Sequence, residues 1–115
     1  MTVDSVTTDT AVPEDVLTQI PLQVRAAYPE DVAVLGVPIS CFESGMMWAM
    51  PVRFICGTHY VALHRLESAS TRLVSMPREV QAMMSESIRL PTLCLVEGVL
   101  QIVVHTRQGD RRFPF

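Results

Sequence analysis

The sequence contains no lysine and no asparagine, and its nine basic residues are all arginine. Because no folding requirement excludes both residues, we attribute this bias to the codons of a GC-rich genome. One chemical consequence is that no Asn-Cys dipeptide occurs anywhere in the chain. The arginines are also dispersed: only Arg111 and Arg112 are adjacent, and no aromatic residues alternate with a basic stripe. With a net charge of −3, the chain is not expected to bind nucleic acid directly.

Long apolar runs and a secretory leader are also missing. No run reaches the roughly 18 apolar residues of a transmembrane helix, and the first residues have neither the basic nor the apolar segment of a signal peptide. The only cysteines are Cys41, Cys56 and Cys94, an odd number without CxxC spacing, which argues against a zinc ribbon or a disulfide framework. We therefore expect reduced thiols in a cytoplasmic protein, with no metal site and no cofactor.

What the chain does contain is typical of one globular domain. Its 115 residues are 49% hydrophobic and only 18% charged. Residues 1–11 show no useful period and predict a flexible N-terminal arm, while residues 12–115 predict a single α+β domain. The segment Pro13-Glu14-Asp15 suits the first turn of a helix, because proline fits there and the acids face the positive end of the helix dipole. Pro21 predicts a break, followed by a second short helix to about Tyr28.

The remainder alternates short apolar strands with turn residues and one further helix. Residues 31–40 predict a strand weakened by Gly36 and Pro38. The later elements are a hairpin of Met46–Cys56 and His59–Leu66 joined at Gly57-Thr58, a strand at 71–76, a helix opening at Pro77, a pair Thr92–Val96 and Val99–Thr106 joined near Glu97-Gly98, and a polar tail over 108–115. The fold class is therefore α+β: a mostly antiparallel sheet, N-terminal helices, and one helix inserted between strands.

The histidines are the residues with the clearest chemical potential. Because side chains alternate along a strand, His59 shares a face with Val61 and Leu63, while His64 points to the opposite face. His59 follows the turn, where a side chain can be half exposed. His64 is expected to face solvent or to pack with Tyr60, and His105 has no obvious partner. By itself, a lone histidine on a strand is more often structural than catalytic.

Residues 45–106 resemble the H-box/NC family, the lecithin–retinol acyltransferase-like group that includes cellular phospholipase/acyltransferases and some picornaviral 2A proteins. The matching segments, in order, are Gly45–Met50, His59-Tyr60-Val61-Ala62-Leu63, Arg72-Leu73-Val74, Pro77-Arg78-Glu79-Val80 and Leu95–Val104. The resemblance implies that His59 is the H-box histidine. It also implies a permuted papain-like (NlpC-like) architecture, of which this chain carries only the histidine half of the site.

Three departures from the family pattern bear on activity. Leu73 stands where cellular members carry a second histidine, so the third polar partner of the site is missing. The family's Asn-Cys motif lies on a later helix, and this chain ends before such a helix. None of the three cysteines has the neighbours of that motif. A Cys–His hydrolase needs an imidazole within hydrogen-bond reach of a thiol, so we expect this chain to be catalytically silent on its own.

Three functions follow from these patterns. The first is a viral non-structural 2A protein of the kobuvirus type that supports viral RNA replication in the host cell cytoplasm. It would act through viral or host proteins, for instance in a membrane-associated replication complex, and not by proteolysis. The second is a thiol hydrolase or acyltransferase on lipid or amide substrates, with His59 as base and a cysteine from outside this chain, or Cys41 or Cys56. The third is a non-enzymatic, acidic, secretion-chaperone-like binding module.

Overall fold

The computed structural model describes residues 12–41 and 45–115 and confirms the α+β class. The helical elements are α2 (Glu14–Ala27), α3 (Arg78–Met83) and the 3₁₀ turn η1 (Met84–Glu86), and the strands are β1 (Ala33–Leu35), β2 (Ile39–Ser40), β3 (Met47–Phe54), β4 (His59–Arg65), β5 (Ser70–Ser75), β6 (Thr92–Val96), β7 (Val99–Thr106) and β8 (Gly109–Pro114). The arm predicted at 1–11 and most of the turn predicted at 41–44 lie outside the described residues. Within them, no helix is long and apolar enough to cross a membrane.

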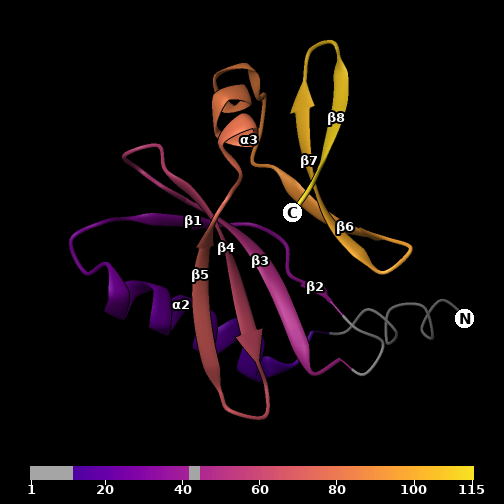
Figure 1. Cartoon of the computed structure of the whole chain (residues 1–115). Helices are drawn as coiled ribbons and strands as arrows, with labels where there is room; N and C mark the ends of the chain where they lie inside the picture. Colours follow the sequence, from indigo (N-terminus) through magenta and orange to yellow (C-terminus); the bar gives the residue numbers. More distant parts are fainter. Residues whose placement is uncertain (1–11, 42–44) are drawn as a thin grey trace, which may run out of the picture.

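The N-terminal helix α2 is continuous, so the predicted break at Pro21 and the second short helix are wrong. A proline inside a helix removes one hydrogen bond and crowds the preceding turn, at a cost of about 3 kcal/mol in a free helix. Here Val16, Ile20 and Val24 lie on one side of the helix and are buried against the sheet on both sides of the proline. Packing of this face stabilises the helix across the proline, and Figure 1 shows α2 running alongside the first sheet.

The first sheet has the strand order β1-β3-β4-β5, and β2 pairs with β3 beyond the end of β1; all these pairs are antiparallel. The predicted hairpin of β3 and β4 is confirmed, although its loop is longer than two residues. The Phe54 N–H donates to the Thr58 carbonyl, and Gly57 takes the positive φ of 101° that the turn requires. The expected strand over 31–40 is divided in two by the Gly36–Pro38 segment.

The second sheet consists of β6, β7 and β8, so the structure has two antiparallel sheets where the sequence predicted one. Glu97 and Gly98 both have positive φ and form the tight turn between β6 and β7, as predicted. The polar tail predicted at 108–115 is wrong, because Gly109–Pro114 is the strand β8 and pairs along β7. Helix α3 does lie between strands, as predicted, linking β5 to β6.

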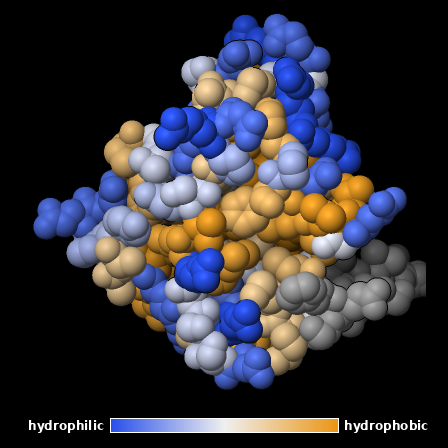
Figure 2. All heavy atoms as spheres, viewed as in Figure 1, coloured by the Kyte–Doolittle hydropathy of each residue, from blue (hydrophilic) through white to orange (hydrophobic). Residues whose placement is uncertain are grey.

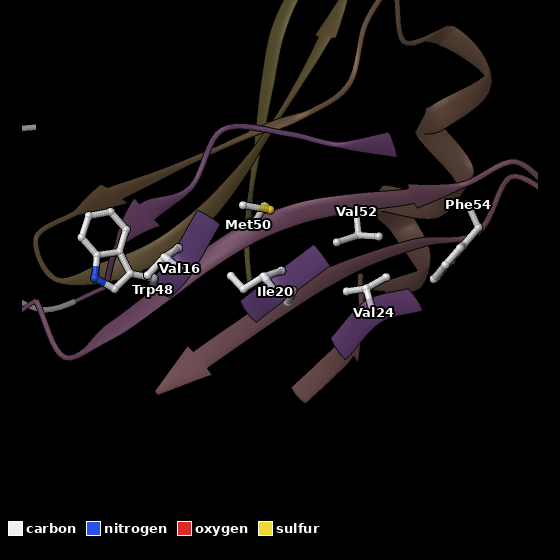
Figure 3. Packing of buried hydrophobic residues seen from close by; sticks show 8 residues of the cluster. Val16, Ile20, Val24, Trp48, Met50, Val52 and Phe54 are labelled. Carbon is white, nitrogen blue, oxygen red and sulfur yellow. The ribbon is translucent and has the colours of Figure 1, made fainter. Parts of the chain in front are cut away.

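The first sheet is buried on both faces. On one face α2 contributes Val16, Ile20 and Val24 to a core with residues of β3 and β4: Trp48, Met50, Val52, Phe54 and Ala62 (Figure 3). The opposite face packs on α3 and the second sheet through Cys41, Ala49, Val61, Met76, Val80, Leu93, Ile102 and Val104. Alternate residues of β3 and β4 therefore enter different cores, which is the period-2 pattern of a strand buried on both sides.

Candidate functional site

His59 begins β4 and points to the face that carries α3, as the alternation of side chains predicts. Gln81 of α3 fixes its backbone: the Gln81 amide donates to the His59 carbonyl at 2.9 Å, and the His59 N–H donates to the Gln81 side-chain oxygen at 3.4 Å. The residue is 6% exposed, so the expectation of a half-exposed imidazole is wrong. Contact with α3 and with the segment after it, which is distant in sequence, buries the ring.

The imidazole lines a small cavity, which we call the His59 pocket, of about 140 Å³. Its lining residues are Arg53, His59, Met84, Ser87, Ile88, Arg89 and Leu90. Burial lowers the pKa of His59, a hydrogen bond between the imidazole and the Gly57 backbone raises it, and the positive charge of Arg53 lowers it further. The pocket therefore holds a neutral imidazole near neutral pH, with two arginines at its wall.

The cysteines lie away from this pocket. Cys41 donates its N–H to the Met47 carbonyl, whereas His59 pairs with Arg53. The six residue steps of β3 from Met47 to Arg53 separate the two sites by ~20 Å along the strand. Burial raises the pKa of its thiol. Cys56 is exposed and lies 3.9 Å from an Asp31 carboxylate oxygen.

Cys94 lies in the second sheet, on the other face of β6 from its buried neighbour Leu93, and it is half-buried. The described geometry thus gives none of the three thiols the imidazole that a Cys–His hydrolase requires.

His64 is fully buried on the α2 face of the sheet, which Tyr60 shares, so the expectation that it faces solvent is wrong. Its Nδ1 lies 2.8 Å from the Thr71 hydroxyl of β5, and its Nε2 is buried with no hydrogen-bond partner among the described residues. Burial lowers the pKa of the imidazole, and the Asp15 carboxylate partly offsets this effect. His64 is a core residue joining β4 and β5.

His105 has partners on both sides, which the sequence did not reveal. Its Nε2 lies 3.0 Å from the Thr92 hydroxyl of β6, and its Nδ1 lies 2.9 Å from an Asp110 carboxylate oxygen of β8. This series of hydroxyl, imidazole and carboxylate resembles the catalytic relay of serine hydrolases. It differs from that relay in which of the three groups is exposed to solvent. The Asp110 side chain is 57% exposed, whereas the orienting carboxylate of such a relay is buried. We interpret these contacts as structural hydrogen bonds that connect the three strands β6, β7 and β8.

A second hollow lies on the α2 side of β1, and we call it the β1 groove. Its cavity volume is about 400 Å³, within the range of ligand sites, and its walls include Val24, Tyr28, Ala33, Leu35 and Phe54. The Tyr28 and Phe54 ring centroids are 4.8 Å apart, so the floor is aromatic. Local sequence patterns do not predict this groove, because its walls come from a helix and two strands that meet only in the fold.

No family model, no curated protein and no solved structure matches the chain. In the part of the chain that the structure describes, no group of three or more His, Cys, Asp or Glu side chains is placed to hold a metal ion. The candidate sites are therefore the His59 pocket and the β1 groove, which flank the edge strand β1 on its two faces.

Proposed function

We propose that this protein is a non-catalytic protein-binding domain that accepts an extended polypeptide segment along the edge strand β1. The observation that carries the proposal is an open strand edge beside a groove whose lining is mainly apolar, with Arg25 and Asp31 as its charged residues. Such an edge binds a peptide through main-chain hydrogen bonds, while pockets for alternate side chains provide specificity. Protein binding is also what the viral 2A and the chaperone-like interpretations have in common.

The hydrogen-bond pattern shows which backbone groups of β1 are available. The Ile55 N–H donates to the Val32 carbonyl, and the Gly36 N–H donates to the Pro51 carbonyl. Residues of an antiparallel strand alternate between bonding their neighbour and pointing away from it. The backbone groups of Ala33 and Leu35 therefore point away from β3, and no backbone partner meets them within the described residues.

The side chains around this edge suit an apolar peptide. On the α2 face, alternate side chains of an added strand would enter the β1 groove. On the opposite face, β1 carries Val34, which is 39% exposed. Val32, just before β1, lines the groove and is 62% exposed, and Ile55, just after β3, is 69% exposed. Burying such side chains contributes about 25 cal/mol per Å² of apolar surface. In the view of Figure 2, apolar residues form a band across the middle of the molecule, between hydrophilic residues above and below it.

Selection from a phage-displayed library of random peptides tests the proposal. Ala33→Pro replaces the outward N–H by a ring carbon and leaves the bonds to β3 intact, so selected peptides should bind at least about tenfold more weakly. Ser75→Pro makes the same change on the opposite edge strand β5 and should leave binding unchanged. The absence of enriched peptides, or equal binding to Ala33→Pro and the wild type, would refute strand addition at β1.

The thiol hydrolase remains the alternative, with His59 as base and a cysteine from outside this chain. Thiol reactivity against pH, followed for each cysteine by mass spectrometry in the wild type and His59→Ala, separates the two functions. An activated thiol reacts well below its ordinary pKa of ~8.5. If the protein is a binding domain, all three thiols should react slowly, and His59→Ala should not change their reaction rates. One thiol that reacts at about pH 6 and is silenced by the substitution would favour the hydrolase.

The viral 2A role and the permuted papain-like half-site architecture remain proposals. They are supported by the position of His59 at the start of β4 and by the helix α3 that follows β5, the order of elements in the H-box/NC family. If the chain acts in viral RNA replication through protein contacts, Ala33→Pro in the viral genome should lower replication. His59→Ala should then have little effect, whereas loss of replication with His59→Ala alone would point to chemistry at the histidine.

A further inference from the structure

The His59 pocket is lined by two arginines and by no carboxylate among the described residues. Arg89 Nη2 lies 3.4 Å from His105 Nδ1, the atom that also contacts Asp110, so Arg53 is the arginine of the pocket that no acid approaches among the described residues. No carboxylate acts on the pKa of His59, which responds to burial, the Gly57 backbone and Arg53. A cavity with two guanidinium groups and no acid among the described residues is electrostatically suited to an anion.

The imidazole itself differs from those of the other two histidines. His105 has hydrogen-bond partners at both ring nitrogens, and Nδ1 of His64 is bonded to Thr71. In His59, which is 6% exposed, Nδ1 is buried without a partner among the described residues, as Nε2 is in His64, but His59 also lines a cavity. A buried polar atom without a partner costs free energy and is uncommon in folded proteins. His59 therefore combines an unpartnered ring nitrogen with a place in the wall of the pocket, while Gln81 fixes the backbone of the residue.

The size and walls of the pocket restrict the ligand further. A volume of about 140 Å³ is the space of fewer than five water molecules at ~30 Å³ each, too small for a drug-sized compound. Met84, Ile88 and Leu90 supply apolar walls. The planar fork of an arginine matches the two oxygens of a carboxylate. We infer that the His59 pocket binds a carboxylate on a short apolar stem, with Arg53 as its principal ligand.

This inference goes beyond the proposed function, because it does not require strand addition at β1. Its test is a titration of the full chain with sodium butyrate, with the His59 imidazole followed by NMR and sodium chloride as the ionic-strength control. A bound carboxylate stabilises the imidazolium, so the pKa of His59 should rise toward its ordinary value. Half-saturation is expected in the millimolar range, as for other ligands of this size.

Matched arginine variants locate the effect. Arg53→Gln should weaken butyrate binding roughly fivefold to tenfold, because it removes a charge-assisted hydrogen bond. Arg72→Gln, on β5 in a separate hollow with Met47 and Leu63, should leave the titration unchanged. The inference is overturned if butyrate moves the His59 signals no more than chloride does, or if Arg53→Gln responds like the wild type.

Peptide ligands then identify the source of the carboxylate. Three peptides of the same apolar sequence are compared: one with a free C-terminus, one amidated at the C-terminus, and one amidated with an internal glutamate. The peptide that shifts the His59 signals at the lowest concentration identifies the source of the carboxylate. If butyrate shifts the signals and none of the peptides does, the ligand is a small free acid. Because these signals report the pocket and not the β1 edge, failure here leaves the library selection at β1 unaffected.

Discussion

Gly36→Ala is the substitution for which the structure gives the sharpest expectation. Gly36 lies where β1 ends, and its backbone approaches Pro51 of β3 and Leu90. A Cβ atom at this position would lie 3.0 Å from Leu90 Cδ2 and closer still to the ring carbon Cγ of Pro51. Carbon atoms in favourable contact are separated by roughly 3.5–4.0 Å. The glycine is thus required by close packing, since its φ is not positive.

The size of the expected loss in stability depends on how little the residues around Gly36 can move. Pro51 is fully buried, so the backbone of β1 must shift to admit the methyl group. Overpacking of this kind costs about 1–3 kcal/mol, and the reduced entropy of the unfolded chain returns about 0.4–1 kcal/mol. The difference is about 0–2.6 kcal/mol, and the close approach to the buried Pro51 ring favours its upper part, so we expect a net loss of about 1–2 kcal/mol in the free energy of unfolding. In urea denaturation the midpoint should fall by roughly 0.5–1 M with an unchanged slope.

A double-mutant cycle with Pro51→Ala provides the control. Removing the proline ring makes room for the new methyl group, so Gly36→Ala should be less costly in the Pro51→Ala background than in the wild type. A neutral or stabilising effect of Gly36→Ala in the wild type would show that the space at this position is open. Equal costs in both backgrounds would show that the clash with the Pro51 ring is not the cause.

Three further predictions concern the core and its histidines. Burial lowers the pKa of His59 and His64, so the free energy of unfolding should be level above pH ~6.5 and fall as the pH drops below it. Urea titrations at several pH values check this expectation. His64→Leu should reduce the dependence of the free energy of unfolding on pH. Ile20→Ala should cost about 2–4 kcal/mol because the side chain is fully buried, whereas Leu17→Ala on the exposed face of the same helix should stay within about 0.5 kcal/mol. Gln23→Ala should lower the free energy of unfolding by about 1–2 kcal/mol in the same assay. The Gln23 side chain accepts a hydrogen bond from the Thr71 N–H and donates one to the Ala69 carbonyl, at the edge of β5. An unchanged urea midpoint would contradict a stabilising role for these two hydrogen bonds.

Local signals in the sequence are sufficient where neighbouring residues settle the conformation. The β3–β4 hairpin follows from two apolar runs around Gly57, and the β6–β7 turn follows from Glu97-Gly98, because positive φ angles are cheapest at glycine. Alternation along β4 predicts opposite faces for His59 and His64, and the two side chains do lie on opposite faces of the sheet. These features depend on contacts between residues close in the chain.

Other features depend on distant contacts, and local patterns do not predict them. The strand β8 has the composition of a polar tail, since it is mostly exposed, and it forms because β7 offers it a free edge. The partners of His105 come from β6 and β8, on either side of its own strand. The β1 groove and the His59 pocket exist only once α2 and the segment after α3 are packed on the first sheet.

The sequence by itself determined the α+β class, most strands, the start of α2 and the two faces of β4, because these follow from periodicity and local turn geometry. The tertiary structure decided that α2 continues through Pro21 and that the strands form two sheets. It also decided which ring nitrogens of the histidines have hydrogen-bond partners. The physical reason is that burial, charge and steric closure around a residue are set by segments far away in the chain. At Gly36 and His59, those segments decide what the residue can do.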